Sequence, residues 1–340
     1  MMKRRAFLQT SGLAAASMFV PKLIQASASP FLLPDTNGRI LIVIQWSGGN
    51  DGLNTVVPFT NDLYYKMRPT LGLKKDQILT LTDDLGIHPK LLALKSMYDN
   101  GELAIIENVG YPEPDRSHFR SMDIWQSASA SNEYIHTGWI GRILDSGMKP
   151  EYALEIDDSL SLALKGQNKK GLAIRNMKHA AALSRMTNAL QIEHHDHDQV
   201  SYLQQTLIKA QQGIDYLSAQ TGKRNNQAIY PANELGQQLK SIAALINGGC
   251  STTAYYVTLG GFDTHVGQPG TQNRLFDAYA QAVNALRSDL KATGRWNDVA
   301  ILTFSEFGRR VSENAGKGTD HGTAGVSFIM GGNIKKPGLY

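Results

Sequence analysis

The stretch "RILIVIQWSGGNDGLN" at residues 39–54 decides the fold class, because a largely apolar run passes directly into a glycine-rich turn. A continuous apolar run is typical of a strand that is buried on both faces of a parallel sheet. The turn matches neither G-x-x-x-x-G-K-[ST] nor G-x-G-x-x-G, so it does not predict a nucleotide-binding loop. It is either a plain Asn-Asp-Gly turn or a turn that presents Asp51 at the sheet edge as an oxygen ligand for a divalent cation.

Four further apolar runs resemble the first one, and patterns with helical spacing separate them. The apolar runs lie at residues 102–110, 253–261, 299–307 and 326–332. The helical patterns lie at residues 89–101, 198–222, 232–249 and 272–294. This alternation predicts an α/β fold with a doubly wound, mostly parallel sheet that is flanked by helices. Sites in such sheets lie at the carboxyl ends of the strands, so the polar residues that follow each run are the candidates.

The first 28 residues have the form of an export signal. A basic segment (residues 3–5) precedes a short apolar segment (13–20) and the small-residue pattern Ala26-Ser27-Ala28. The pair Arg4-Arg5, followed by "AFLQ", resembles a twin-arginine signal, and an ordinary secretory signal or a weak anchor is the alternative. The apolar segment is too short for a stable span of the bilayer.

We therefore expect cleavage of residues 1–28, with the mature chain starting near Ser29. Residues 29–340 would form a single domain of a periplasmic or otherwise exported protein, with the twin-arginine export machinery as a partner. The chain ends "GGNIKKPGLY" soon after the last apolar run, which predicts that a C-terminal segment is missing.

Charge and cysteine content exclude several classes of partner and site. The four basic residues of the signal account for the whole formal net charge of +4, so the mature chain is close to neutral. Nucleic acid and anionic membranes are therefore not expected partners. Cys250 is the one cysteine, which excludes an intrachain disulfide and a cysteine-based metal site.

The segment "YPEPDRSHFRSMDIWQ" at residues 111–126 contains the candidate nucleophile. Its two prolines delay a helix until about Asp115, which places Ser117 at the helix N-terminus. Ser117 is either an N-cap or a nucleophile, because a helix N-terminus also stabilises an anion and a serine alkoxide. Arg116 and Arg120 could hold a phosphate or sulfate through two hydrogen bonds each.

Candidate metal ligands follow the later apolar runs. In "LGGFDTHVGQ", Asp263 and His265 offer an oxygen and a nitrogen to one cation, although a turn cap and a surface histidine would give the same pattern. Glu306 ends a buried strand, where a carboxylate needs a partner. Asp320 and His321 lie between glycines before the last apolar run. The "EHHDHD" segment at residues 193–198 is better explained as a solvated loop or a helix start.

Four motifs occur in an order that resembles the bacterial family called domain of unknown function 1501. They are "LIVIQWSGGNDGLNTVVPF", "PDRSHFRSMDIW", "GGFDTH" and "FSEFGRR…GTDHGTAG", and they extend over residues 41–340. The activity of this family is uncharacterised, but the family is similar to the alkaline phosphatase and sulfatase superfamily. That resemblance implies a doubly wound sheet with one or two divalent metal ions at its carboxyl edge.

The resemblance also implies roles for particular residues. Ser117 matches the nucleophile. The implied ligands form a zinc-like site (Asp263, His265, His321) and a second, oxygen-rich site (Asp51, Glu306 and Ser117). Oxygen ligands favour magnesium, calcium or manganese at the second site. Phe307 stands where the superfamily places a metal-binding imidazole, so the second site lacks its usual imidazole.

The function that this resemblance implies is that of an exported metal-dependent hydrolase, which acts on a small phosphate or sulfate ester. Ser117 would attack the phosphorus or sulfur atom, and Arg116 or Arg120 would hold the ester oxygens. A non-catalytic metal-binding envelope protein of the same fold is the alternative, which the substitution at Phe307 motivates. A metal-dependent mutase or transferase is a third interpretation.

Overall fold

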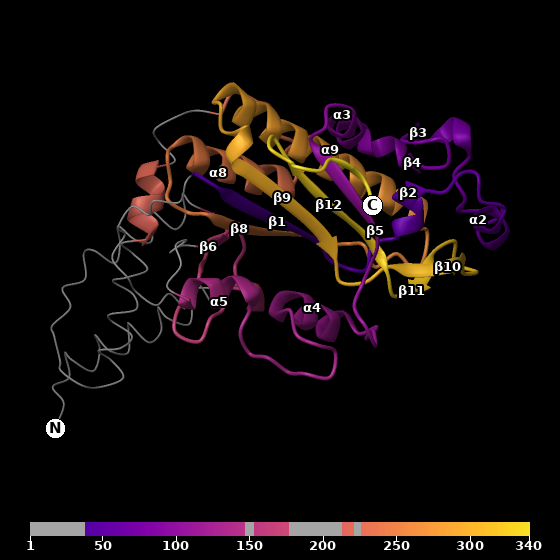
Figure 1. Cartoon of the computed structure of the whole chain (residues 1–340), viewed down its shortest axis with the longest axis horizontal. Coiled ribbons are helices and arrows are strands. Elements are labelled where there is room, and N and C mark those ends of the chain that lie inside the picture. Colours follow the sequence, from indigo (N-terminus) through magenta and orange to yellow (C-terminus); the bar gives the residue numbers. More distant parts are fainter. Residues whose placement is uncertain (1–37, 147–152, 177–212, 221–225) are drawn as a thin grey trace, which may run out of the picture.

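The fold is built on one eight-stranded central sheet, seen edge-on between two layers of helices in Figure 1. The computed structural model describes residues 38–146, 153–176, 213–220 and 226–340. In sheet order the strands are β13 (Gly338–Leu339), β5 (Leu103–Val109), β12 (Gly325–Gly331), β9 (Val299–Ser305), β1 (Ile40–Trp46), β8 (Ala254–Leu259), β6 (Ala153–Glu155) and β7 (Leu172–Ala173). The predicted α/β class, with a mostly parallel sheet flanked by helices, is confirmed.

β1 lies inside the sheet and pairs in parallel with β8 and β9, with Val43 opposite Tyr256 and Leu302. β12 is antiparallel to both of its neighbours, β9 and β5. The reason is the connection, because residues 306–324 contain a hairpin at the carboxyl edge of β9. A parallel strand would need a crossover to the opposite edge, so the chain runs back instead. The apolar pattern of β12 alone does not distinguish these two directions.

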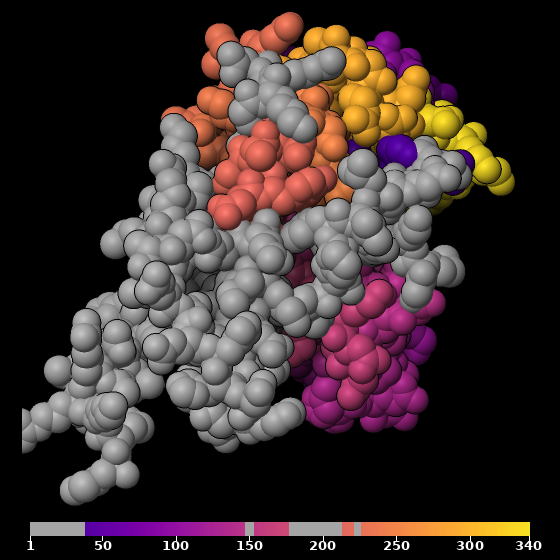
Figure 2. Space-filling model, turned by 90° about the vertical axis from the view of Figure 1, so that its left-hand side faces the viewer, coloured from indigo at the N-terminus to yellow at the C-terminus, as the bar shows by residue number. Residues whose placement is uncertain are grey.

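Helices cover both faces of the sheet. The α-helices are α2 (Asp62–Met67), α3 (Leu92–Asp99), α4 (His118–Ser127), α5 (Trp139–Asp145), α8 (Glu234–Asn247) and α9 (Gln268–Ala292), and residues 213–220 are also helical. Figure 1 shows α3, α8 and α9 on one face and α4 and α5 on the other. The side view in Figure 2 shows the same separation, with the orange segments above and the magenta segments below.

Short strands and 3-10 turns complete the fold. The small strands are β2 (Val56–Val57), β3 (Leu79–Thr80), β4 (Gly86–Ile87), β10 (Arg309–Glu313) and β11 (Thr319–His321). The 3-10 turns are η1 (Gly52–Asn54), η2 (Lys75–Gln77), η3 (Pro89–Leu91), η4 (Leu162–Leu164) and η5 (Trp296–Asp298). β10 pairs with β11 as the hairpin that leads from β9 to β12, and β2, β4 and β3 form a separate sheet.

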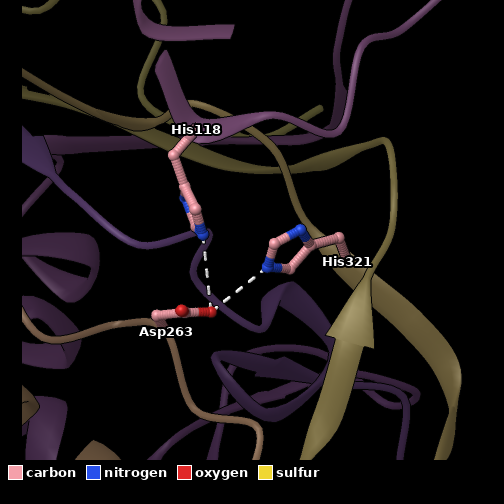
Figure 3. Close-up of side chains that lie close together, drawn as sticks. All are labelled: His118, Asp263 and His321. Atoms are coloured by element: carbon pink, nitrogen blue, oxygen red, sulfur yellow. Dashed lines mark hydrogen bonds and ion pairs between the residues drawn. The ribbon is translucent and has the colours of Figure 1, made fainter. Parts of the chain in front are cut away.

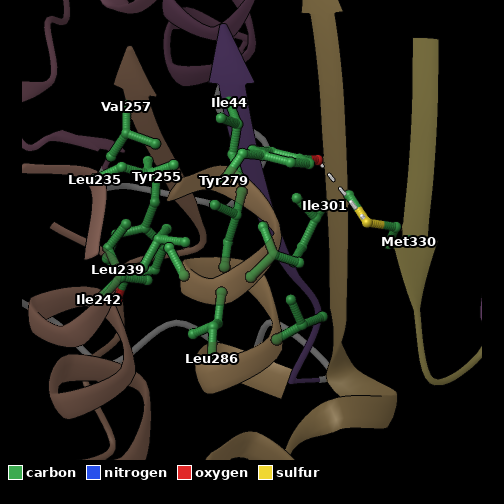
Figure 4. Close-up of a cluster of buried hydrophobic side chains, with 14 of the residues drawn as sticks. Ile44, Leu235, Leu239, Ile242, Tyr255, Val257, Tyr279, Leu286, Ile301 and Met330 are labelled. Atoms are coloured by element: carbon green, nitrogen blue, oxygen red, sulfur yellow. Dashed lines mark hydrogen bonds between the residues drawn. The ribbon is translucent and has the colours of Figure 1, made fainter. Parts of the chain in front are cut away.

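The core reflects the two-residue alternation along β1. Ile42 and Ile44 face the cluster formed with α8 and α9, whereas Val43 packs on the other side with Ile140 and Leu144 of α5. Figure 4 shows the first cluster, where apolar side chains of α8 and α9 meet the strands. Because both faces are covered, the central strands are largely apolar and do not alternate between apolar and polar residues.

The predicted helix over residues 272–294 begins four residues earlier, at Gln268. Pro269 lies in its first turn, where the fixed backbone of proline favours helix initiation. No helix in the described part of the chain is long and apolar enough to cross a membrane. The predicted signal peptide (1–28) and the "EHHDHD" segment (193–198) lie outside the described residues.

Glu155 on β6 gives the fold a pH dependence that can be measured. Burial raises the pKa of Glu155 from 4.5 to about 7, although the hydrogen bond from the Ser161 amide acts in the opposite direction. Between these two values the folded state keeps a proton that the unfolded state has released. The free energy of unfolding therefore falls as the pH rises through this window.

We expect Glu155→Gln to be more stable than the wild type at pH 8, by up to about 3 kcal/mol. At pH 4.5 the two proteins should have similar stability, because Glu155 is then protonated in the folded state. Urea unfolding at both pH values measures the difference, with the exposed Glu133→Gln as the control. An equal difference at pH 4.5 and pH 8 would contradict this account.

Candidate metal centre

The candidate site forms where several chain segments meet at the carboxyl edge of the sheet. β1, β5, β8 and β9 all end at this edge, and β12 begins there. The segments that meet are the turn after β1, the N-terminus of α4, the loop after β8 and the β10–β11 hairpin. The topology therefore brings together side chains that are separated by up to about 270 residues in sequence.

One oxygen atom, Oδ1 of Asp263, is the meeting point of three imidazole rings. The Nε2 atoms lie 3.5 Å (His118), 3.0 Å (His265) and 3.2 Å (His321) from this oxygen. The Nε2 atoms of His265 and His321 are 3.0 Å apart. Figure 3 shows His118 and His321 directed at Asp263 from α4 and β11. We call these four residues the histidine cluster.

The other ring nitrogen of each histidine faces an acceptor. Nδ1 of His118 is 2.9 Å from Glu306, Nδ1 of His265 is 3.2 Å from Asp320, and Nδ1 of His321 is 2.9 Å from the carbonyl oxygen of Arg116. A carbonyl or an ionised carboxylate can only accept, so each Nδ1 carries the ring hydrogen. In a neutral ring, Nε2 then presents a lone pair to the centre of the cluster, whereas in a protonated ring Nε2 donates to Asp263, as at His321.

This arrangement is suited to a cation. Lone pairs that converge within 3.0–3.5 Å of a carboxylate oxygen repel one another unless a positive charge lies between them. Nε2 of His118 is buried and has no hydrogen-bond partner among the described residues. The spacings resemble the edge of a tetrahedron with metal–ligand distances of 2.0–2.1 Å, which is about 3.3 Å. The ligand atoms of His118, Asp263 and His321 all lie within 4.8 Å of one another.

Two outer carboxylates orient the imidazoles. Asp320 accepts from Asn314 and His265, and these hydrogen bonds lower its pKa. Glu306 is fully buried, and its Oε1 atom accepts from the Gly48 amide at 2.7 Å as well as from His118. The structure thus gives Asp320 and Glu306 places behind the imidazoles, where such carboxylates fix the ring orientation and raise the basicity of the ligand.

Arg309 supports Asp263 from the interior. Its guanidinium group has no exposed surface, and Nη2 donates to Asp263 Oδ1 at 2.7 Å. Burial by itself would raise the pKa of Asp263, but the hydrogen bonds from Arg309 and His321 outweigh this effect and lower the pKa to about 2. Asp263 is therefore ionised over the whole physiological pH range.

His118 supplies the imidazole that sequence reasoning did not find. The superfamily comparison placed that imidazole at residue 307, whereas Phe307 packs against the rings of His118 and His321, with centroids 4.9 and 4.7 Å apart. The imidazole beside Glu306 comes instead from the first residue of α4. The sequence signal was the "RSH" triplet, in which His118 directly follows the candidate nucleophile.

The two glycines after β1 permit this close packing. Gly48 and Gly49 have φ angles of 123° and 74°, which side-chain-bearing residues rarely adopt. A Cβ atom on Gly48 would lie 2.3 Å from the Asp263 amide, and one on Gly49 would lie 2.2 Å from the ring of Phe307. The glycine-rich turn therefore allows the loop after β8 and the ring of Phe307 to pack closely against its backbone.

Asp51 lies outside the histidine cluster, in a buried ion pair. Its carboxylate accepts from Arg68 at 2.5 and 2.9 Å and from Gln268 at 2.5 Å, so N–H donors face both oxygens. Arg68 follows α2 and is fully buried beside Asp51. These contacts occupy the oxygens that a cation would need, so the structure gives Asp51 a different partner from the one expected.

The residues around the candidate nucleophile differ in their availability. Ser117 precedes α4 as its N-cap residue but makes no capping hydrogen bond with its side chain, and it is exposed. Arg116 is also exposed. Arg120 instead donates to the carbonyl groups of Ala130, Ser131 and Glu133, so its guanidinium group holds the following loop rather than the cluster.

Comparisons with known proteins place the chain in a family. Solved structures with similarity include the C-terminal periplasmic domain of EcEptC from Escherichia coli in complex with Zn (11% identity, TM-score 0.40, covering 92% of this chain and 78% of that chain). Similarity also extends to the lipoteichoic acid synthase LtaP from Listeria monocytogenes (10% identity, TM-score 0.36, covering 96% of this chain and 73% of that chain). A TAB5 alkaline phosphatase mutant with Mg bound is similar too (9% identity, TM-score 0.38, covering 89% of this chain and 94% of that chain). No curated protein sequence matches this chain. The model of the family described as "Protein of unknown function (DUF1501)" matches residues 39–340, and the chain therefore belongs to that family.

Proposed function

We propose that this chain is an exported, zinc-dependent hydrolase of phosphate or sulfate esters, with the histidine cluster as its metal centre. The observation that carries the proposal is the orientation of the three imidazoles, whose Nδ1 atoms face acceptors and whose Nε2 atoms face Asp263. Imidazole nitrogens with one carboxylate are a ligand set that zinc prefers. When bound, the cation would stabilise negative charge on the ester oxygens and on the attacking oxygen.

Asp320 provides a test of this centre, because it faces the cluster only through His265. We expect Asp320→Asn to weaken zinc binding by roughly 10–100-fold, the range typical of residues that orient a metal ligand. Competition with a chromophoric chelator measures the affinity. The exposed Asp123→Asn on α4 is the matched control. Equal affinities for the wild type and both variants would show that Asp320 does not support a metal ligand.

Ser117 is the proposed nucleophile because His118, which follows it, belongs to the cluster and Arg116, which precedes it, contacts the cluster. The carbonyl group of Arg116 accepts from His321, and the ring of His118 faces Asp263. The Ser117 hydroxyl is free of a capping bond, and it lies at the N-terminus of the ten-residue helix α4. The partial positive charge of this helix end favours both the serine oxyanion and a bound anionic ester.

The proposed reaction has two displacement steps. Oγ of Ser117 releases its proton to solvent and forms a bond to phosphorus or sulfur while the bond to the leaving ester oxygen breaks, and that oxygen takes up a proton from solvent. A water molecule then cleaves the serine ester and releases phosphate or sulfate. The exposed Arg116 would bind the remaining oxygens of the substrate, and Phe307 would exclude water from the inner side of the imidazoles.

The experiment that tests the function is turnover of aryl phosphates and aryl sulfates by protein reloaded with zinc, magnesium or manganese. We expect hydrolysis that depends on the metal and disappears with a chelator. Stoichiometric metal without turnover would instead support a non-catalytic metal-binding envelope protein, an alternative that the ion pair between Asp51 and Arg68 favours. Transfer of the group to an added alcohol would indicate a transferase.

Export through the twin-arginine machinery is a further part of the proposal. Replacement of both Arg4 and Arg5 by lysine is expected to leave most of the chain in the cytoplasm, because this route reads the arginine pair. Fractionation of bacterial cells that contain the machinery measures the distribution. Lys22→Arg, which keeps the pair, is the control, and unchanged export of the double variant would indicate a general secretory signal.

A further inference from the structure

We propose that the metal centre holds a single divalent cation, and that the guanidinium group of Arg309 takes the place of a second one. This inference rests on the proposed metal centre and concerns the number of cations in it. Two-metal hydrolases place their ions about 3.5–4 Å apart and share a ligand between them. In this chain the group that shares Asp263 with the histidine cluster is a fixed side-chain cation.

Arg309 occupies a cage of oxygen atoms. Its donors face the carbonyl oxygens of Gly48, Gly49, Phe262 and Thr319 and the Oδ1 atom of Asp263. The contact with Gly49 is 2.6 Å and the contact with Thr319 is 2.8 Å. Four carbonyl oxygens and one carboxylate oxygen form a set that a hard cation would accept as ligands. In this structure they surround a guanidinium group that has no exposed surface.

The Oδ1 atom of Asp263 lies between Arg309 and the imidazoles. Oδ1 accepts from Arg309 on the interior side and faces Nε2 of His265 and His321 on the other. Nη1 of Arg309 also lies 3.4 Å from Nε2 of His265. A divalent cation among the imidazoles would therefore have a fixed positive charge as its inner neighbour, which leaves no place for a second divalent ion.

N–H donors also face both oxygens of Asp51 and one oxygen of Glu306, the two buried carboxylates at this edge. Arg68 and Gln268 face the oxygens of Asp51. The amide of Gly48 and the ring of His118 face Oε1 of Glu306, while Oε2 lies 3.3 Å from the hydroxyl of Ser305. A donor that points at an oxygen occupies the direction from which a metal ion would approach.

The charges of the centre also favour one divalent cation. Asp51 and Arg68 neutralise each other as a buried pair. The other carboxylates of the centre are Asp263, Glu306 and Asp320, which together carry three negative charges when ionised. Arg309 and one divalent cation supply three positive charges, whereas a second divalent cation would leave an excess of positive charge among these groups.

The first test is the zinc content of the full chain. Metal-free protein is titrated with zinc, and native mass spectrometry with elemental analysis gives the number of bound ions. One zinc ion per chain is the expected result. Two ions at specific sites would overturn the inference but leave the metal-dependent function standing, whereas no bound ion would overturn both.

The second test asks whether Arg309 is the cause. Arg309→Ala removes the guanidinium group and leaves the oxygen cage, so we expect the zinc-loaded variant to bind one calcium ion with a Kd of roughly 0.1–1 mM, whereas the wild type binds none. Arg309→Lys, which keeps the charge, and Arg310→Ala, which alters an exposed neighbour, should resemble the wild type. A folded Arg309→Ala that holds one zinc ion and no calcium would overturn the role of Arg309.

If Arg309→Ala does not fold, calcium binding to the wild type and to Arg309→Lys decides the question. Both should hold one zinc ion and exclude calcium, even when calcium is at 10 mM. Anomalous diffraction at the zinc edge gives an independent readout, with one peak expected between Asp263 and the imidazoles. A second peak beside Arg309 would contradict the proposal.

Discussion

Ser117→Ala is expected to lower turnover of the aryl phosphate or sulfate that the wild type hydrolyses by roughly 10³-fold or more. Loss of a covalent nucleophile removes the attacking atom from the reaction. Zinc binding should be unchanged, since the side chain of Ser117 makes no hydrogen bond to the histidine cluster. Hydrolysis of an aryl phosphate or sulfate under saturating zinc measures the first quantity, and chelator competition measures the second. The combination separates a nucleophile from a residue that merely supports the metal centre.

Two further serine variants serve as controls for Ser117→Ala. Ser96→Ala alters an exposed serine on α3, which covers the opposite face of the sheet, and should leave turnover unchanged. Ser117→Thr keeps a hydroxyl group at the N-terminus of α4 and should recover part of the activity. Unchanged turnover in Ser117→Ala would exclude Ser117 as the nucleophile. A parallel loss of zinc would assign it to the metal centre instead.

Arg68→Met is expected to lower the free energy of unfolding by about 3–5 kcal/mol, because it leaves the buried carboxylate of Asp51 without its charged partner. The guanidinium group is fully buried, and it also donates to Asn54 and to the carbonyl oxygens of Arg310 and Val311. Methionine keeps much of the apolar volume, so the loss reports on charge and hydrogen bonds. Urea unfolding at pH 7 measures the effect.

The double variant Arg68→Met with Asp51→Asn tests the cause of that loss. Removal of both charges together should recover a large part of the stability, because the variant no longer buries an isolated charge. Zinc content should stay at the wild-type value, since Asp51 is paired away from the histidine cluster. Loss of zinc in Asp51→Asn alone would return Asp51 to the metal ligands.

A large part of the fold follows from local pattern. The continuous apolar runs identified β1, β5, β8, β9 and β12, and the prolines before Asp115 identified the N-terminus of α4. The helix predicted from Pro89 begins there as η3 and continues as α3 from Leu92. These features depend on residues that are close in sequence, so the pattern is sufficient. The direction of β12 was not predictable in this way, because it depends on the path of residues 306–324 through a hairpin.

The candidate site was predictable in location but not in its partners. Strand ends led to Asp263, His265, Glu306 and His321, which the structure brings to one edge of the sheet. His118 was missed, because its role depends on the position of α4 beside Glu306 and not on local spacing. Asp51 and Arg120 lie at this edge too, but their partners are Arg68 and a backbone loop.

The sequence by itself determined which residues lie at the carboxyl edge, since strand ends and turns are local properties of the chain. Only the tertiary structure decided which side chains face one another there. The turn at Gly48 and Gly49 shows the difference. Local pattern suggested that it presents Asp51, whereas the fold uses it to admit Phe307 and the loop that carries Asp263. The charge on Asp51 is neutralised by Arg68, 17 residues away in sequence, and this pairing depends on long-range packing that no local pattern encodes.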